Sequence, residues 1–193
     1  MTRTNYIFID FENVHEIELV RVAGKPVKVV LILGEQHKKL PIALVKQVHQ
    51  HASAVRLLET GCSGKNALDL VLASCMGEAK TADPHGYFHI LSTDKDFDAL
   101  IGHYKTNGLL AARHESFSEI PVLMNKAERV NFIVTRLKSK QVTRAKKRAR
   151  LESQIQALFG KALSEPELQD TIGGLIAAKA IEIATSDEVI YKL

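Results

Sequence analysis

The chain has 193 residues, of which 46% are hydrophobic, 25% charged and 6% aromatic, and its formal net charge is +4. These fractions are those of a folded globular protein, and they exclude disordered, collagen-like and coiled-coil chains. No apolar run approaches the roughly 18 residues that a bilayer crossing requires, so no membrane partner is expected. The two cysteines, Cys62 and Cys75, provide neither a disulfide framework nor a CxxC metal motif, and we expect a reducing, cytoplasmic setting.

The net charge of +4 conceals a separation of charge along the chain. Outside positions 136–150 there are 18 basic and 22 acidic residues, a net charge of −4. A basic segment of this kind is suited to attracting the backbone of a nucleic acid, although a solvated helix face explains it equally well. Its eight basic residues, with no acid among them, are Arg136, Lys138, Lys140, Arg144, Lys146, Lys147, Arg148 and Arg150.

The first half of the chain alternates between strand-like and helix-like segments. Apolar runs with little alternation, separated by helices, are typical of a parallel sheet buried on both faces. The predicted fold class is therefore α/β, with a doubly wound, mostly parallel sheet. Strands are expected at 6–9, 27–33, 54–58, 87–91 and 109–112, and helices at 42–51, at 64–77 and from residue 97 onward.

Beyond Ser118 the strand signal fades. Helices are expected over 120–126 and 128–137, the second being amphipathic. We expect the basic segment that follows to be helical as well, and to continue as a helix to Gly160.

A capping box marks the start of the next helix. Ser164 and Glu167 occupy its two positions and Pro166 lies in the first turn, which predicts a helix reaching Lys179. The apolar residues then alternate, which predicts a β-hairpin; they are Ile181, Ile183, Val189 and Tyr191. These patterns divide the whole chain into three predicted parts: a main α/β domain over 1–138, a basic helical linker over 139–150 and a small winged-helix-like α+β unit over 151–193.

Acidic residues follow the predicted strands at the positions where doubly wound sheets bind ligands. Asp10 directly follows the first strand, and Asp94, Asp96 and Asp98 follow the fourth. Asp69 lies about one turn into the helix after the third strand. Because ligands bind outside the carboxyl ends of the strands at the switch point, these carboxylates are expected to converge on one crevice.

Convergent carboxylates imply a cation. Like charges brought close together raise one another's pKa unless positive charge intervenes. About four carboxylates without a Cys/His set favour a hard divalent metal, Mg²⁺ or Mn²⁺. At an open site such a metal mostly serves phosphate chemistry, where it orients a water and neutralises developing charge.

Three segments together resemble the motifs of the bacterial NYN branch of the PIN-like nucleases. They read DFENV from Asp10, GKNALD from Gly64 and STDKDFD from Ser92. They occur in the family's order on a βαβ scaffold, and the resemblance covers roughly residues 5–125. It implies a PIN-like three-layer α/β/α fold and metal-dependent hydrolysis of phosphodiester bonds, typically of RNA, by an activated water.

The resemblance also implies roles for individual residues. Asp10, Asp69 and Asp94 would bind the metal directly or through water. Either Asp96 or Asp98 would be the fourth carboxylate; Asp96 is slightly favoured, and Asp98 suits the first turn of a helix. Asn13 would hold Asp10 or the substrate, Ser92 would support the loop that presents Asp94, and Asn66 would lie at the helix start near the site. The nucleic-acid contacts are expected from the charge of the basic segment and not from the resemblance; they are assigned to Arg144, Lys146, Lys147, Arg148 and Arg150.

Two alternatives stay open at this point. The first is a non-catalytic nucleic-acid-binding module with a PIN-like fold, although convergent carboxylates without metal would repel phosphate. The second concerns the winged-helix-like unit. Because its helix from Ser164 to Lys179 carries few basic residues for groove contact, formation of a homodimer is an equally good role. RNA rather than DNA is only the family's usual substrate, and the number of metal ions is open.

Overall fold

The computed structural model describes residues 3–139 and 142–193; Lys140, part of the basic segment, lies outside them. The chain forms two compact units, Met1–Leu123 and Met124–Leu193, which are described separately below. This division lies earlier than the domain boundary expected at residue 138. Helix α4 (Lys126–Lys138) therefore belongs to the second unit. Among the described residues, no helix combines the length and apolar character needed to cross a bilayer.

The first unit is built on five parallel strands in the spatial order β3-β2-β1-β4-β5. The chain moves outward from β1 to β3 and then continues on the other side of β1, so the switch point lies between β1 and β4. Ile9 pairs with both Leu31 and Leu91, which aligns the carboxyl ends of the three central strands. The strands are β1 (Asn5–Asp10), β2 (Val27–Leu33), β3 (Val55–Glu59), β4 (Tyr87–Leu91) and β5 (Leu110–His114).

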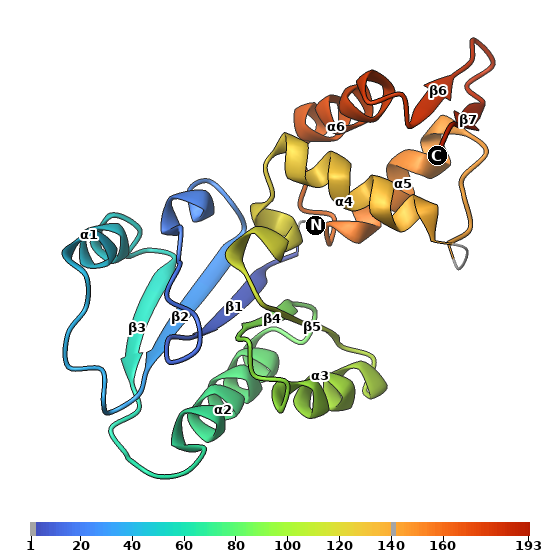
Figure 1. The fold of residues 1–193 in the computed structure, drawn as a ribbon. Helices are drawn as coiled ribbons and strands as arrows, with labels where there is room; N and C mark the ends of the chain where they lie inside the picture. The colour runs from blue at the N-terminus through green and yellow to red at the C-terminus, as the bar shows by residue number, and fades with distance from the viewer. Residues whose placement is uncertain (1–2, 140–141) are drawn as a thin grey trace. The chain divides into compact units, whose positions relative to one another are not determined.

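Helices cover both faces of this sheet (Figure 1). On one face lie α2 (Ala67–Ala82) and α3 (Phe97–Thr106); on the other lie α1 (Ile42–Gln50) and the 3-10 turn η1 (Leu19–Val22). All six residues of β1 are buried, as expected for a central strand covered on both sides. The three-layer α/β/α prediction is confirmed. The core beneath α2 and α3 includes Phe8, Leu72, Met76, Phe88, Ile90 and Ile101.

The predicted strands are confirmed to within one or two residues, whereas one helix end is wrong. We expected the helix after β3 to end at Gly77, but α2 continues to Ala82. Met76 is fully buried and Ala79 packs against the same core. Their burial offsets the cost of a glycine inside a helix, which is about 1 kcal/mol.

The α-helix expected over 120–126 is also wrong. The chain instead forms two 3-10 turns, η2 (Phe117–Glu119) and η3 (Pro121–Leu123). Ile120, Val122 and Leu123 are all buried, a pattern that a one-sided surface helix does not show. Helix α4 starts only after this segment, where Asn125 and Glu128 form a capping box.

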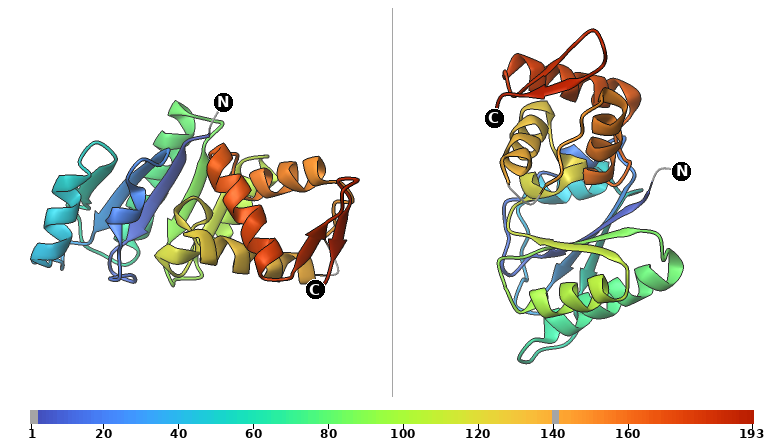
Figure 2. Two further views of the ribbon diagram at one scale, coloured as in Figure 1. Left: turned by 90° about the horizontal axis from the view of Figure 1, so that it is seen from above. Right: turned by 90° about the vertical axis from the view of Figure 1, so that its right-hand side faces the viewer.

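The second unit packs α4, α5 (Arg148–Leu158) and α6 (Glu165–Ala177) around one apolar core, followed by an antiparallel hairpin of β6 (Ile181–Ile183) and β7 (Val189–Tyr191) (Figure 2). The capping box of Ser164 and Glu167 and the alternating hairpin are confirmed. Gly174 allows α6 to approach α4 closely, because a Cβ there would meet Val130 Cγ2 at 2.6 Å. The winged-helix assignment stays a prediction.

The basic segment is not a continuous helix, contrary to expectation. In its described part, residues 142–147 are non-helical and α5 begins only at Arg148. Lys147 forms a β-bridge with Glu188, and the backbone N–H of Val189 donates to the carbonyl of Lys146 at 2.9 Å. Ala145 is buried in the core of this unit. Pairing with the hairpin therefore replaces the helical hydrogen bonds of this stretch.

Candidate active site

Asp10 connects two of the three motif segments. It is the last residue of β1 and is fully buried. Its Oδ2 accepts hydrogen bonds from Asn13 Nδ2 and Ser92 Oγ, both at 2.7 Å, and its Oδ1 accepts one from the backbone N–H of Glu12 at 3.1 Å. A carboxylate removed from water requires such donors. Since a carboxylate offers about four acceptor sites, Asp10 keeps capacity for a further ligand.

The third segment is folded back on itself by side-chain hydrogen bonds to its backbone. Ser92, buried directly after β4, accepts at Oγ a hydrogen bond from the backbone N–H of Asp94 at 3.0 Å. Asp94 Oδ1 in turn accepts one from the backbone N–H of Asp96 at 2.9 Å. Asp94 is half-buried and Asp96 is exposed. Ser92 thus links the Asp10 carboxylate to the loop that presents Asp94.

The three segments meet at a polar pocket of about 240 Å³. Its walls come from the loops that follow β1 to β4 and from the start of α2, so it lies at the carboxyl ends of the strands, where doubly wound folds bind ligands. Asp10 does not itself line the pocket. The lining residues are Glu12, Asn13, Gly34, Glu35, Gln36, Thr60, Cys62, Ser63, Gly64, Asn66, Ala67, Leu68, Asp69 and Asp94.

The negative charge around this pocket affects the pKa of Asp69, which lies in the first turn of α2. The pKa of Asp69 is raised above its ordinary value, mainly because partial burial removes its carboxyl group from water. The negative charges of Asp10, Asp94, Glu12 and Asp96, in that order of effect, raise the pKa further. These carboxylates therefore act on one another through space, and a bound cation would relieve their repulsion.

The donor set fits a hard, hydrated divalent cation. All the candidate ligands are carboxylate oxygens, which suit Mg²⁺ and Mn²⁺. Among the residues that the structure describes, no three His, Cys, Asp or Glu side chains form a compact ready-made metal site. Mg²⁺ usually keeps several waters and binds through one or two carboxylates, so such a complete cage is not required.

Asp98 is engaged elsewhere. Its Oδ1 accepts a hydrogen bond from Arg113 Nε at 2.8 Å, and this bond lowers the pKa of Asp98. Asp98 is not among the residues whose charge acts on Asp69, whereas Asp96 is. The two candidates for the fourth carboxylate therefore differ in their surroundings, and the preference for Asp96 stays a prediction.

Two residues of the pocket, Glu12 and Glu35, were missed or undervalued in the sequence. Side-chain alternation past Asp10 favours a solvent-facing Glu12; Glu12 is indeed exposed, and it also lines the pocket. Its carboxylate lies so close to Gly34 that a Cβ at this position would overlap it. Glu35 comes just after the end of β2, so the strand-end rule that selected Asp10 and Asp94 could have found it. Asn66 lies directly before α2 with a φ of 61° and also lines the pocket.

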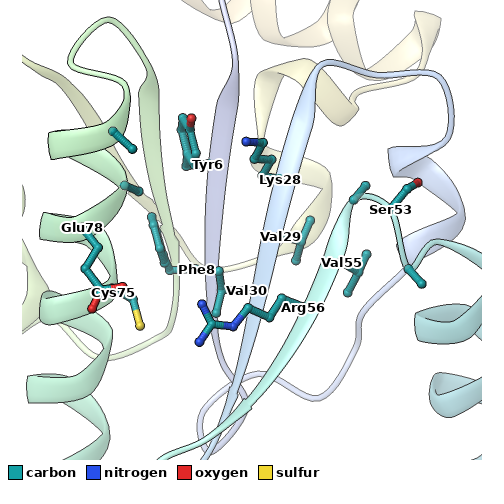
Figure 3. Close-up of a pocket in the computed structure, with 14 residues that line it drawn as sticks. Tyr6, Phe8, Lys28, Val29, Val30, Ser53, Val55, Arg56, Cys75 and Glu78 are labelled. Carbon is teal, nitrogen blue, oxygen red and sulfur yellow. The ribbon is translucent and has the colours of Figure 1, made fainter.

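A second cavity, of about 350 Å³, lies on the open part of the sheet face beside α2 (Figure 3). Its walls are mainly apolar, with Lys28, Arg56 and Glu78 as the charged groups. Figure 3 shows Cys75 and Glu78 of α2 across from Val30 and Arg56 of the sheet. The cavity holds none of the predicted carboxylates, so the acidic pocket is the candidate site.

The five basic residues predicted to contact nucleic acid fall into two groups, those whose side chains have protein partners and those whose side chains have none among the described residues. Arg148 hydrogen-bonds to Glu152 and Gln169, and Lys147 Nζ donates to the carbonyl of Ser186 at 2.9 Å. Arg144 donates to the carbonyl of Leu137 and lies over the Tyr191 ring. Lys146 and Arg150 are exposed, with no side-chain partner among the described residues.

A doubly wound α/β domain with an acidic pocket at its switch point places the protein among the α/β proteins that bind a ligand at the carboxyl ends of their strands. The family comparison then matches residues 4–114 to the PIN domain, which is more than half of the chain. The protein therefore belongs to the PIN domain family, whose members are generally metal-dependent nucleases. Searches of curated proteins and of solved structures found no match.

Proposed function

We propose that the protein is a metal-dependent endoribonuclease of the NYN branch of the PIN family. The observation that carries this proposal is the convergence of carboxylates from three distant chain segments on one polar pocket. Glu12, Asp69 and Asp94 line the pocket, and Asp10 and Asp96 act on Asp69 through their charge. A phosphodiester is itself anionic, so a pocket of this sign is useful to such a substrate only with a cation present.

The residues divide into ligands and supports. Asp69 and Asp94 would hold Mg²⁺ or Mn²⁺ from the pocket wall, and Asp96 and Glu12 would bind its water shell. Asp10 would contribute its remaining acceptor site while Asn13 and Ser92 hold its carboxylate in place. When bound, the cation supplies a water of lowered pKa and neutralises charge that develops on the phosphate.

The basic residues provide the substrate-binding part of this proposal. Within the described part of the chain the side chains of Lys146 and Arg150 have no competing partner, so among the five predicted residues they are the best candidates for contact with the RNA backbone. Replacing both with Gln should weaken RNA binding and reduce its salt dependence by about 0.7 in slope for each lost phosphate contact on a single strand. A Lys80→Gln/Lys105→Gln variant makes the same charge change at exposed positions of the first unit. Equal losses in the two variants would refute a specific role for Lys146 and Arg150.

We extend the proposal to the winged-helix-like unit with one restriction. Its helix α6 carries Glu165, Glu167 and Asp170 in its first two turns, which repel phosphate. Nucleic acid would therefore contact the basic segment rather than α6, and α6 remains available to a second copy in a homodimer. Light scattering of the purified protein measures the oligomeric state. Cys62 and Cys75 are both free thiols, in keeping with a reducing, cytoplasmic setting.

Cleavage of labelled single-stranded RNA tests the proposed activity. Wild-type protein is incubated with Mn²⁺ or with a chelator, beside Asp10→Asn and Asp94→Asn variants. Asp170→Asn is the control, because it removes an exposed carboxylate of the second unit. We expect cleavage only with metal, and only by the wild type and the control. Equal cleavage by all variants would refute the site, and RNA binding without cleavage under any divalent metal would favour a non-catalytic binding module.

A further inference from the structure

Arg113 joins β5 to both ends of the loop that carries the third motif. Its side chain is only 11% exposed. Nε donates to Asp98 Oδ1 at 2.8 Å, and Nη1 donates to the backbone carbonyl of Ser92 at 2.9 Å and to Glu115 Oε1 at 3.3 Å. A guanidinium presents its donors in a rigid planar fork, so these contacts define one orientation. The loop from Ser92 to Asp98 is thereby anchored at its first and last residues.

Ser92 transmits this anchoring to the pocket. Its carbonyl is held by Arg113, while its hydroxyl donates to Asp10 Oδ2 and accepts the backbone N–H of Asp94. The backbone N–H of Ser92 also donates to the carbonyl of His114 at 3.0 Å. Every polar group of Ser92 is thus satisfied in a single geometry. Displacing the guanidinium would release the residue that positions both Asp10 and Asp94.

We propose that Arg113 is a positioning residue of the active site, which holds the Ser92–Asp98 loop so that Asp94 and Asp96 face the cation. The inference rests on the proposed function, because it assigns the loop to metal binding. Two carboxylates, Asp98 and Glu115, already neutralise the positive charge of Arg113. Its contribution is therefore geometric, and a lysine, with one compact ammonium group, cannot reproduce the contacts.

The Arg113→Lys variant tests this role because it preserves the charge. Direct Mn²⁺ binding is measured by titration calorimetry, and RNA cleavage is measured in parallel. Loss of a group that orients metal ligands typically costs about 10- to 100-fold in metal affinity or activity. We expect losses of this size in Mn²⁺ affinity and kcat with KM for RNA unchanged. Added guanidinium ion should partly restore an Arg113→Ala variant, since it can occupy the vacated position.

Arg129→Lys is the matched control. Arg129 is likewise buried and donates to a backbone carbonyl, that of Met124, and to Thr171, but it lies in the second unit. Its substitution should leave Mn²⁺ affinity unchanged. If Arg113→Lys does not fold, Asp98→Ala removes the acceptor of the Arg113 Nε hydrogen bond at an exposed position and should lower Mn²⁺ affinity several-fold.

The outcomes separate this inference from the proposed function. Mn²⁺ binding by Arg113→Lys as tight as that of the wild type would overturn the role of Arg113, as would unchanged binding by Asp98→Ala. If the wild type binds Mn²⁺ without cleaving RNA, the ribonuclease proposal fails while the binding comparison still decides the role of Arg113. A wild type that binds no Mn²⁺ overturns both.

Discussion

Acidification should destabilise the first unit through a buried histidine pair, His89 and His114. His89 is fully buried, its Nε2 lies 2.9 Å from Asn5 Oδ1, and its Nδ1 lies 3.1 Å from His114 Nε2. Asn5 Oδ1 is an acceptor, so Nε2–H of His89 donates to it and Nδ1 of His89 accepts from Nε2–H of His114. This chain requires a neutral His89, because a protonated His89 would set two N–H groups against each other. Protonation of His114 leaves this hydrogen bond intact and is opposed by burial of the ring instead.

The magnitude follows from the pKa of His114. Burial removes this ring from water and lowers its pKa to about 4, although the nearby negative charge of Glu119 acts in the opposite direction. The unfolded chain takes up the proton near pH 6.5. Between these two values the unfolded state binds more protons, so stability is full above pH 6.5 and falls as the pH drops to about 4. The loss attributable to His114 is about 3 kcal/mol, and the lowered pKa of His89 acts in the same direction.

Urea denaturation followed by circular dichroism at pH 7, 6, 5 and 4 measures this loss. His114→Gln is the informative variant, because the amide nitrogen of Gln can take the place of Nε2 without titrating. We expect it to stay within about 1 kcal/mol of the wild type at pH 7, the scale of one hydrogen bond. It should then lose much less stability than the wild type on acidification. The exposed His49→Gln variant is the control, and parallel pH profiles of wild type and His114→Gln would refute the assignment.

Two further predictions concern the pocket. In Gly34→Ala the new Cβ would displace the Glu12 carboxylate. We expect the Mn²⁺ affinity of this variant, measured by titration, to fall to that of Glu12→Gln. An affinity equal to that of the wild type would exclude Glu12 from the site. Ser92→Ala removes a donor to the buried Asp10 carboxylate; we expect a loss of about 1–3 kcal/mol in the free energy of unfolding together with weaker Mn²⁺ binding. A Ser92→Ala variant as stable as the wild type would show that Asp10 finds another donor.

The sheet and its strand-end acids were predictable because their signals are local. A run such as Val27–Leu33 is apolar except for Lys28, and a nearly continuous apolar run is typical of a parallel strand that is buried on both faces. The same sheet topology then brings the residues after the strands together, whichever loops connect them. The start of α6 was equally predictable, since Ser164 and Glu167 satisfy the first helical N–H groups without tertiary help.

What was missed depends on contacts between distant positions. The hydrogen bond between Asp98 and Arg113, 15 residues away, is one such contact. Residues 142–147 left the helical conformation because the hairpin at Glu188 offers backbone partners that no local pattern reveals. Gly34 reads as a simple strand terminator, although its missing side chain makes room for Glu12. In each of these cases a contact between residues far apart in the sequence decides the local structure.

A crystal structure in Mn²⁺ would show whether the pocket between Asp69 and Asp94 holds the catalytic cation. We expect an anomalous scattering peak in this pocket, close enough to both carboxylates for direct or water-mediated binding, and we expect this peak to be absent from crystals of the Asp94→Asn variant. The absence of a peak from the pocket in crystals saturated with Mn²⁺, or the same peak in the variant, would contradict the assignment of this pocket to the cation.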